Sequence, residues 1–311
     1  MKGVHKSLQI YINIQELQMK ILVTGGAGFI GSNLIAALIR EDKDYEIVSL
    51  DCYWTGKKEN HISNSNVTYI NGHTWDISNI FENESFDLIY HFGEFSRIVE
   101  SFNQLNFLSK SNLYGTSMVL EYARINNTKL IYSASSSKFG NGGKDENLAP
   151  YSWMKAKMVE LIKNYRSWFG LEYEICYFFN VYGPNQIYEG EYSTVVAIFE
   201  RQFLNNEKCT VVEPGTQVRD FTHVNDIVNG LMKAKNVSKN EEWLLRAGRN
   251  MSIIELAELF GKWEFIPERR GERLAAPTDI VRGDTLNDLN WKPNENIEDW
   301  INFVKSKKTI N

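Results

Sequence analysis

A glycine-rich turn at residues 24–31, Thr-Gly-Gly-Ala-Gly-Phe-Ile-Gly, constrains the fold of this 311-residue chain more than any other feature. The apolar run 19–23 before it is typical of a buried strand, and the apolar residues after it recur at helical spacing. Gly25 permits a tight turn, Gly28 lets the backbone approach a diphosphate, and Gly31 lets the helix pack close to the sheet. The N–H groups and the positive dipole end of the helix would then face the diphosphate.

An acidic residue at the end of the next apolar run supports this interpretation over an ordinary strand-to-helix turn. The segment 47–51 reads Ile-Val-Ser-Leu-Asp, which places Asp51 20 residues after Gly31. In dinucleotide-binding folds, a carboxylate at this place accepts hydrogen bonds from the adenosine ribose hydroxyls. It would also repel the 2′-phosphate of NADP, and no arginine stands at 52 or 53 to offset it. We therefore expect NAD as the cofactor.

Strand and helix patterns alternate through the first half of the chain, with further strands expected near 67–70, 86–92, 129–133 and 172–178. Repeated βα units predict an α/β fold, a Rossmann-like doubly wound parallel sheet covered by helices on both faces. Its ligands would bind beyond the carboxyl ends of the strands. The predicted organisation is a poorly ordered extension at 1–18, a NAD-binding domain at 19–182 rejoined by elements near 218–246, and a smaller interleaved substrate domain over 183–311.

Composition excludes several classes of protein. The chain is 43% hydrophobic and 23% charged, with a net charge of −5 and no long basic block, so neither nucleic acid nor an anionic membrane is an expected partner. No apolar run approaches the roughly 20 residues of a membrane-spanning helix. The three cysteines lie far apart without metal-ligand spacing. We expect a cytoplasmic protein with reduced thiols and no metal site.

A second motif, Tyr-Ser-Trp-Met-Lys at 151–155, predicts the reactive groups. Pro150 and the apolar stripe that follows indicate that this segment opens a helix, on which Tyr151 and Lys155 share one face. The ammonium would favour the phenolate, so that a phenol with an ordinary pKa of about 10 could act as a base near neutrality. The motif alone would also fit a solvated helix face. Its position 16 residues after Ser135, in a serine-rich strand end, argues against that alternative.

Together with FNVYGP at 179–184, RDFTHVNDI at 219–227 and PERRGE at 267–272, these motifs resemble the extended short-chain dehydrogenase/reductase family, in its nucleotide-sugar epimerase and dehydratase branch. The resemblance covers about residues 19–306. It implies that Tyr151 is the catalytic base, that Lys155 is its partner, and that Ser135 hydrogen-bonds the sugar hydroxyl. The implied cofactor contacts are Gly25, Gly28, Phe29, Ile30, Gly31, Asp51, Asp76, Ile77, Phe92, Gly93, Asn112, Tyr151 and Lys155. The implied contacts to a nucleotide-diphosphate sugar are Glu94, Ser136, Asn180, Arg219 and Arg269, with the two arginines on the diphosphate.

Two of these residues have plainer alternatives. Asp76 could accept from an adenine amino group or could cap a helix. Glu94 stands where the family mostly has a small residue, so it is either a specificity contact or added acid/base, or a solvated or paired loop acid.

The residues after Ser135 bear on the reaction. Family dehydratases usually carry an acid there, whereas this chain has Ser136 and Ser137, which cannot protonate a leaving group at neutral pH. We therefore expect a 4-epimerase, in which Tyr151 takes the 4-hydroxyl proton and hydride leaves and returns through a transient 4-keto sugar. The alternatives are a 4-keto-sugar reductase or 4-dehydrogenase, a dehydratase, and a catalytically idle nucleotide-binding scaffold. The resemblance also implies a homodimer built from helices at about 101–125 and 151–168.

Overall fold

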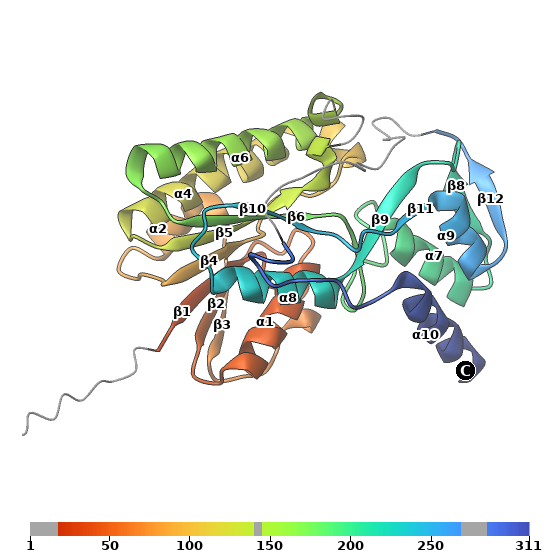
Figure 1. Cartoon of the computed structure of the whole chain (residues 1–311), viewed down its shortest axis with the longest axis horizontal. Helices are drawn as coiled ribbons and strands as arrows, with labels where there is room; N and C mark the ends of the chain where they lie inside the picture. The colour runs from red at the N-terminus through yellow and green to blue at the C-terminus, as the bar shows by residue number, and fades with distance from the viewer. Residues whose placement is uncertain (1–17, 140–144, 269–284, 311) are drawn as a thin grey trace, which may run out of the picture.

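A seven-stranded sheet forms the framework of the computed structural model, which describes residues 18–139, 145–268 and 285–310. The strand order is β10-β6-β5-β4-β1-β2-β3, and every neighbouring pair is parallel. Figure 1 shows the sheet between two layers of helices. The strands are β1 (Lys20–Thr24), β2 (Glu46–Asp51), β3 (Val67–Asn71), β4 (Leu88–His91), β5 (Lys129–Ser135), β6 (Tyr173–Phe178) and β10 (Glu242–Leu245).

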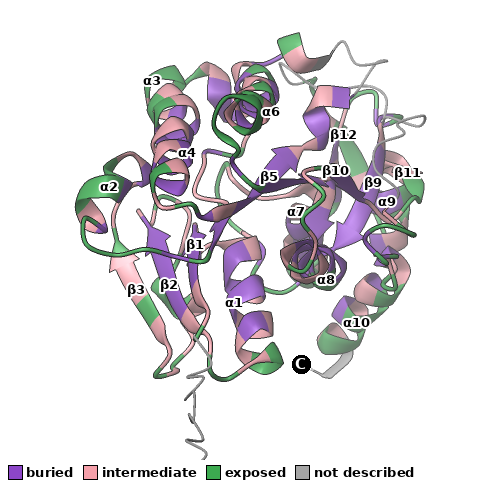
Figure 2. Ribbon diagram, turned by 60° about the vertical axis from the view of Figure 1, so that its left-hand side comes forward, coloured by how far each residue is buried: buried purple, intermediate pink, exposed green. Residues whose placement is uncertain are grey.

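Helices cover both faces of this sheet, which confirms the predicted doubly wound α/β fold. Successive side chains of β1 point to opposite faces, as the pleat of a strand requires. Leu22 packs in a core with residues of one helix layer, whereas Ile21 and Val23 pack in a second core with the other. The first layer contains α2 (Ile77–Ile80), α4 (Thr116–Ile125) and α6 (Pro150–Phe169), and the second contains α1 (Phe29–Glu41) and α8 (Val224–Lys235). In Figure 2 the inner strands β1 and β2 are buried, while the edge strand β3 is half-exposed.

The second half of the chain adds two small sheets with a core of their own. One has the order β11-β9-β7, and the other pairs β12 with β8. Their shared core lies beyond one end of the large sheet, and the chain returns from it through α8 to β10, which pairs with β6. The elements are β7 (Asn180–Tyr182), α7 (Val195–Leu204), β8 (Cys209–Val212), β9 (Val218–His223), β11 (Asn250–Ser252), α9 (Ile253–Phe260), β12 (Trp263–Ile266) and α10 (Ile297–Ile310).

The stretch expected as a helix at 101–125 is interrupted in the structure. It contains the short helix α3 (Leu105–Leu108), a π-helical stretch at 109–115, and then α4. The wide π turn coincides with a close approach to the segment after β3, because a Cβ on Gly115 would lie 2.4 Å from Thr74 Oγ1. The same stretch carries Asn112, whose side chain bonds the loop after β4.

The sequence also predicts that Met118, Leu120, Met158 and Leu161 would be partly bare outside a dimer, which is wrong for two of them. Leu120 and Met158 are buried, because they face the sheet and belong to its core. The exposed apolar side chains near these helices include Tyr114, Ile125, Trp153, Trp168 and Phe169. Within the described residues, the model has no helix long and apolar enough to cross a membrane.

Candidate active site

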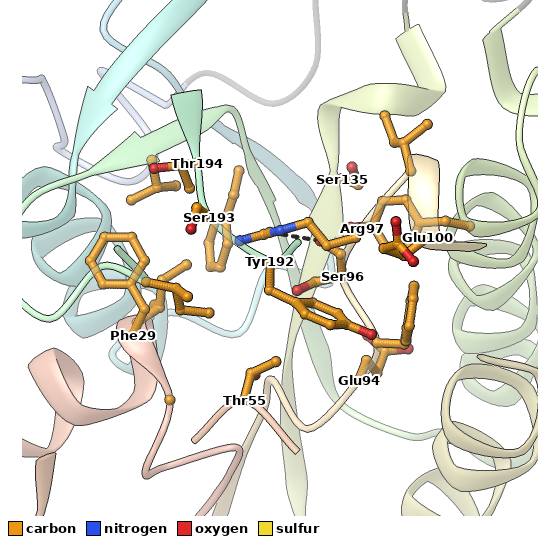
Figure 3. Close-up of a pocket in the computed structure, with 18 of the residues that line it drawn as sticks. Phe29, Thr55, Glu94, Ser96, Arg97, Glu100, Ser135, Tyr192, Ser193 and Thr194 are labelled. Carbon is orange, nitrogen blue, oxygen red and sulfur yellow. Dashed lines mark hydrogen bonds between the residues drawn. The ribbon is translucent and has the colours of Figure 1, made fainter. Parts of the chain in front are cut away.

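A cavity of about 1020 Å³ opens at the carboxyl ends of the parallel strands. Its walls come from the segments that follow β1 to β6 and from the first turn of α6. Residues around α7 and β9 complete them, in the part of the molecule formed by the two small sheets and their core, called the second lobe below. This is where an open parallel sheet binds its ligands. Figure 3 shows Phe29, Ser135 and Tyr192, from three distant parts of the sequence, around this one space.

The glycine-rich turn fits a diphosphate. Gly25 has a left-handed φ of +72°, and a Cβ there would lie 2.9 Å from the carbonyl carbon of Phe92. A Cβ on Gly31 would lie 2.2 Å from Gly25 O, so α1 can pack on the turn only if residue 31 is glycine. Gly28 caps α1 with extended backbone and lines the cavity. The unsatisfied N–H groups of the first helical turn therefore face open space.

Asp51 closes this end of the cavity, at the end of β2. Its Oδ2 accepts from the Ala27 N–H at 3.0 Å, and its Oδ1 accepts from the Tyr53 N–H at 2.8 Å. Burial raises the pKa of this carboxyl, and the backbone donors partly counteract the effect. The carboxylate thus holds two loops together and still borders the cavity, where it can accept from ribose hydroxyls.

The structure places Asp76 and Ile77 away from this cavity wall. Asp76 is exposed, Ile77 is buried, and neither is among the described lining residues. The neighbouring positions His73, Thr74 and Trp75 line the cavity instead. The rings of His73 and Trp75 stack on each other with centroids 3.8 Å apart, and Lys110 Nζ lies over the Trp75 ring at 4.4 Å.

Ser135, Tyr151 and Lys155 all border the cavity, as predicted for reactive groups. Pro150 starts α6, which places Tyr151 in its first turn and Lys155 one turn further along the same face. The ring of Tyr151 packs against the cluster of Phe95, Leu108 and Met154. Ser135 stands at the end of β5, and its Oγ accepts from the Ser137 N–H at 3.2 Å.

Glu94 is paired with Lys155. Both side chains are buried, with exposed fractions of 2% and 5%, and their charged groups form an ion pair. The carboxylate also accepts from Thr116 Oγ1 at 2.8 Å and from the Tyr132 hydroxyl at 3.1 Å. Lys155 donates in addition to the Ser133 carbonyl. Of the alternatives open for Glu94, the structure shows the paired loop acid, and its partner is Lys155, the expected partner of Tyr151.

A buried histidine connects this pair to the glycine-rich turn. Thr24 Oγ1 accepts from the N–H groups of Phe92 and Gly93, and it lies 2.7 Å from His91 Nδ1. His91 Nε2 lies 2.9 Å from Thr116 Oγ1, whose own proton goes to Glu94. The donors therefore run in one direction, with His91 neutral and its proton on Nε2. Burial lowers the pKa of His91 to about 4, in agreement with this assignment.

The remaining predicted cofactor contacts divide into two groups. Phe29, Ile30, Phe92 and Gly93 line the cavity. Asn112 is fully buried, outside the described lining. Its amide accepts from the Phe95 N–H at 2.8 Å and donates to the Phe95 carbonyl at 2.9 Å. It therefore braces the loop that carries Glu94.

On the substrate side, Ser136, Asn180 and Arg219 line the cavity. Asn180 donates to the Asp220 carbonyl at 3.1 Å, and buried Arg219 donates to the Val218 carbonyl at 3.0 Å. Arg269 lies outside the described residues. Among the described residues, no cluster of three His, Cys, Asp or Glu side chains could hold a metal ion.

Sequence reasoning missed Arg97, on the loop after β4. It lines the cavity, and its pKa falls to about 10 because of burial, while the phenols of Tyr151 and Tyr192 counteract the effect. It belongs to none of the motifs quoted above, so only its distance of six residues from the strand-end His91 could have indicated a place at the site.

Comparisons with known proteins agree on the family and divide on the reaction. Residues 21–243 match the model of the NAD dependent epimerase/dehydratase family. A UDP-glucose 4-epimerase from Thermotoga maritima, solved with UDP-glucose, superposes with a TM-score of 0.86 at 26% identity, covering 94% of this chain and 100% of that one. A Bacillus cereus UDP-glucuronic acid 4-epimerase, solved with UDP-glucuronic acid and NAD, gives 0.81 at 25% identity, covering 93% and 100%. A human dTDP-D-glucose 4,6-dehydratase is 25% identical over 334 residues, 92% of this chain and 93% of that protein.

Proposed function

Because this chain belongs to the NAD-dependent epimerase/dehydratase family, we propose that it is a nucleotide-diphosphate-sugar 4-epimerase. The observation that carries the proposal is the site around Ser135. Ser135, Tyr151 and Lys155 border one cavity, and the two positions after Ser135 are the buried hydroxyl residues Ser136 and Ser137. An elimination of water would need an acid beside the sugar, and hydroxyls do not supply one at neutral pH.

The predicted cofactor NAD is that of the family, and it supplies a reversible hydride acceptor when bound. The residues fitted to hold it are Gly25, Gly28, Asp51 and Lys155. Tyr151 would accept the proton of the 4-hydroxyl and later return it, while Ser135 would hold the same oxygen by a hydrogen bond. Lys155 would favour the phenolate through its charge. Arg219 would bind the diphosphate with its planar fork of donors.

Glu94 does not supply the acid of a dehydratase in this arrangement. Its carboxylate is enclosed by Lys155, Thr116 and Tyr132, and these three contacts hold it away from the substrate space beside Ser136 and Ser137. Glu100, which also lines the cavity, is the acid to examine first if water is lost from the substrate.

The test combines cofactor content with product identity. NAD released from the purified protein by denaturation is quantified, and the protein is then incubated with UDP-, GDP-, CDP- and dTDP-sugars without added cofactor. We expect the purified protein to retain NAD. We also expect it to interconvert two sugars that differ only at C4, and NMR of the products monitors this reaction. Turnover only with added NAD or NADH would instead identify a dehydrogenase or reductase. A 4-keto-6-deoxy product would identify a dehydratase, and no turnover with any sugar would favour a scaffold.

We also propose that the active form is a homodimer that covers the exposed apolar side chains Tyr114, Ile125, Trp153 and Trp168, near α4 and α6. Large apolar side chains left exposed near the same two helices would be covered by such an association.

A further inference from the structure

Arg97 extends into the cavity from the loop that also carries Glu94. Figure 3 shows its guanidinium directed toward Tyr192 and Ser193, away from Glu100. The raising effect of the Tyr151 and Tyr192 phenols on its pKa also places the charge between the reactive tyrosine and the second lobe. Arg97 is therefore at the reacting end of the cavity, where the sugar ring would lie, whereas Arg219 lies on strand β9.

The charge of Arg97 has no counterpart in the described residues. Its Nη1 donates to the Ser96 carbonyl at 2.8 Å, its buried Nε has no hydrogen-bond partner there, and none of the described carboxylates forms an ion pair with it. Ser193 Oγ, which also borders the cavity, is likewise buried without a partner in the described part of the chain. By contrast, Lys155 is neutralised by Glu94.

Arg97 is half-buried with a fully buried Nε, and a guanidinium that has lost part of its water without gaining an opposite charge is costly. Such a group is retained where a ligand supplies the anion, and a carboxylate matches the guanidinium fork with two parallel hydrogen bonds. The diphosphate of a sugar nucleotide already has Arg219 on the second lobe. We infer that Arg97 binds a carboxylate on the sugar ring, so that the substrate class is a nucleotide-diphosphate hexuronate.

This inference rests on the proposed function for the nucleotide-sugar ligand, and its test is arranged so that the two can fail separately. UDP-glucuronate and UDP-glucose differ only in the carboxylate at C6. Their affinities for the NAD-loaded protein are measured by calorimetry, and their kcat/KM values are measured wherever turnover occurs. The variants are Arg97→Gln, which keeps length and polarity, and Arg97→Lys, which keeps the charge without the fork. Arg166→Gln is the matched control, because Arg166 lies at the far end of α6 and donates to the Gly170 carbonyl.

We expect the wild-type protein to prefer UDP-glucuronate and Arg97→Gln to lower that preference about 10- to 100-fold, the range of a charge-assisted hydrogen-bonded pair. The preference of Arg97→Lys should lie between those of the wild type and Arg97→Gln, and Arg166→Gln should keep the wild-type preference. Equal treatment of the two sugars by the wild type would overturn the inference, as would an unchanged preference in Arg97→Gln.

A loss of affinity for UDP alone in Arg97→Gln would also overturn the inference, because it would assign Arg97 to the diphosphate. Should Arg97→Gln not fold, the wild-type preference and Arg97→Lys decide. If UDP-glucuronate binds in an Arg97-dependent way but is not epimerised, the inference stands and the proposed 4-epimerase activity is wrong. If sugars are epimerised without an Arg97-dependent preference, the proposed activity stands and the inference is wrong.

Discussion

At the scale of single residues, Glu94 is the buried ion-pair partner of Lys155. Glu94→Gln keeps the size of the side chain but leaves the buried ammonium without its carboxylate. We expect this variant to lower the free energy of unfolding by about 3–5 kcal/mol, the usual cost of breaking a buried pair, as measured by urea unfolding. Tyr132→Phe is the control, because it removes a neutral hydrogen bond to Glu94 and keeps the ion pair. Equal stability of Glu94→Gln and wild type would refute the importance of the pair.

Tyr151 should be the proton carrier. Tyr151→Phe keeps the ring packed on Phe95 and Leu108, so the fold and NAD binding should survive. Loss of a general base typically costs about 10²–10⁴-fold in rate, and we expect a loss in this range in steady-state assays. Lys155→Met acts on the same step, so the double variant should lose less than the product of the single effects. Unchanged turnover in Tyr151→Phe would exclude the mechanism.

The sequence could predict residues in recurrent motifs, because each motif combines a local backbone with a chemical task. Asp51 ends a strand at the expected distance from the glycine-rich turn, and the structure places it at the cavity. The sequence could not predict the pairing of Glu94 with Lys155, which are 61 residues apart. The two meet because β4, which precedes Glu94, and β5, which precedes the helix of Lys155, are neighbours in the sheet. The same holds for Arg97, whose lack of an anionic partner is a property of the folded cavity.

At the scale of elements, His91 links β1 to α4 through Thr24 and Thr116. Its pKa is about 4 in the folded protein and about 6.5 in an unfolded chain, so only the unfolded state gains the proton between these values. This contribution to stability is present above pH 6.5 and is lost as the pH falls toward 4. From pH 7 to 5, we expect wild type to lose about 2 kcal/mol more unfolding free energy than His91→Gln.

Urea unfolding of both proteins at the two pH values measures this difference. Buried carboxyls with raised pKa values, such as Asp51, Glu174 and Asp220, change stability in the opposite direction. They are present in both proteins, so their effect cancels in the comparison. Equal pH dependence of wild type and variant would show that His91 is not held neutral.

Element boundaries were predictable where apolar periodicity determines them and not where tertiary contacts do. The apolar spacing of residues 253–259 predicts a helix, and α9 corresponds closely to it, with a Ser252–Glu255 capping box that fixes its start. The expected helix at 101–125 is divided, because Asn112 bonds the Phe95 backbone and Gly115 approaches Thr74. Those partners lie on other loops, which a periodicity argument does not include.

At the scale of the whole molecule, dimerisation should depend on the surface near α4 and α6. Ile125→Glu places a charge on that surface, whereas Phe303→Glu alters a comparably exposed apolar residue on α10. We expect wild type and Phe303→Glu to sediment as dimers at micromolar concentration and Ile125→Glu to shift toward monomer, because a buried unpaired charge opposes association. A wild-type monomer in the same experiment would refute the dimer.

The Tyr192 phenol is one of the contacts between the two parts of the molecule beside the cavity. Tyr192, on the segment before α7, accepts from Trp54 Nε1 at 2.9 Å and donates to Gln104 at 3.2 Å, while Trp54 stacks on Phe107 at 4.3 Å. We expect NAD to leave past these contacts, so Tyr192→Phe should release NAD faster. A hydrogen bond contributes about 0.5–1.5 kcal/mol, which corresponds to an increase in the dissociation rate of about 2- to 13-fold.

Stopped-flow measurement of NAD release against an excess of a competing nucleotide tests this expectation. Tyr188→Phe is the matched control, because Tyr188 lies four residues away on the same segment and bonds Glu200 at 3.1 Å, outside the described cavity lining. It removes one phenol hydroxyl from the same segment, so a general loosening of this segment would accelerate release in both variants. Faster release in Tyr192→Phe alone would assign cofactor retention to the contact between the lobes. Equal rates in wild type and Tyr192→Phe would mean that NAD leaves without separating Trp54 from Tyr192.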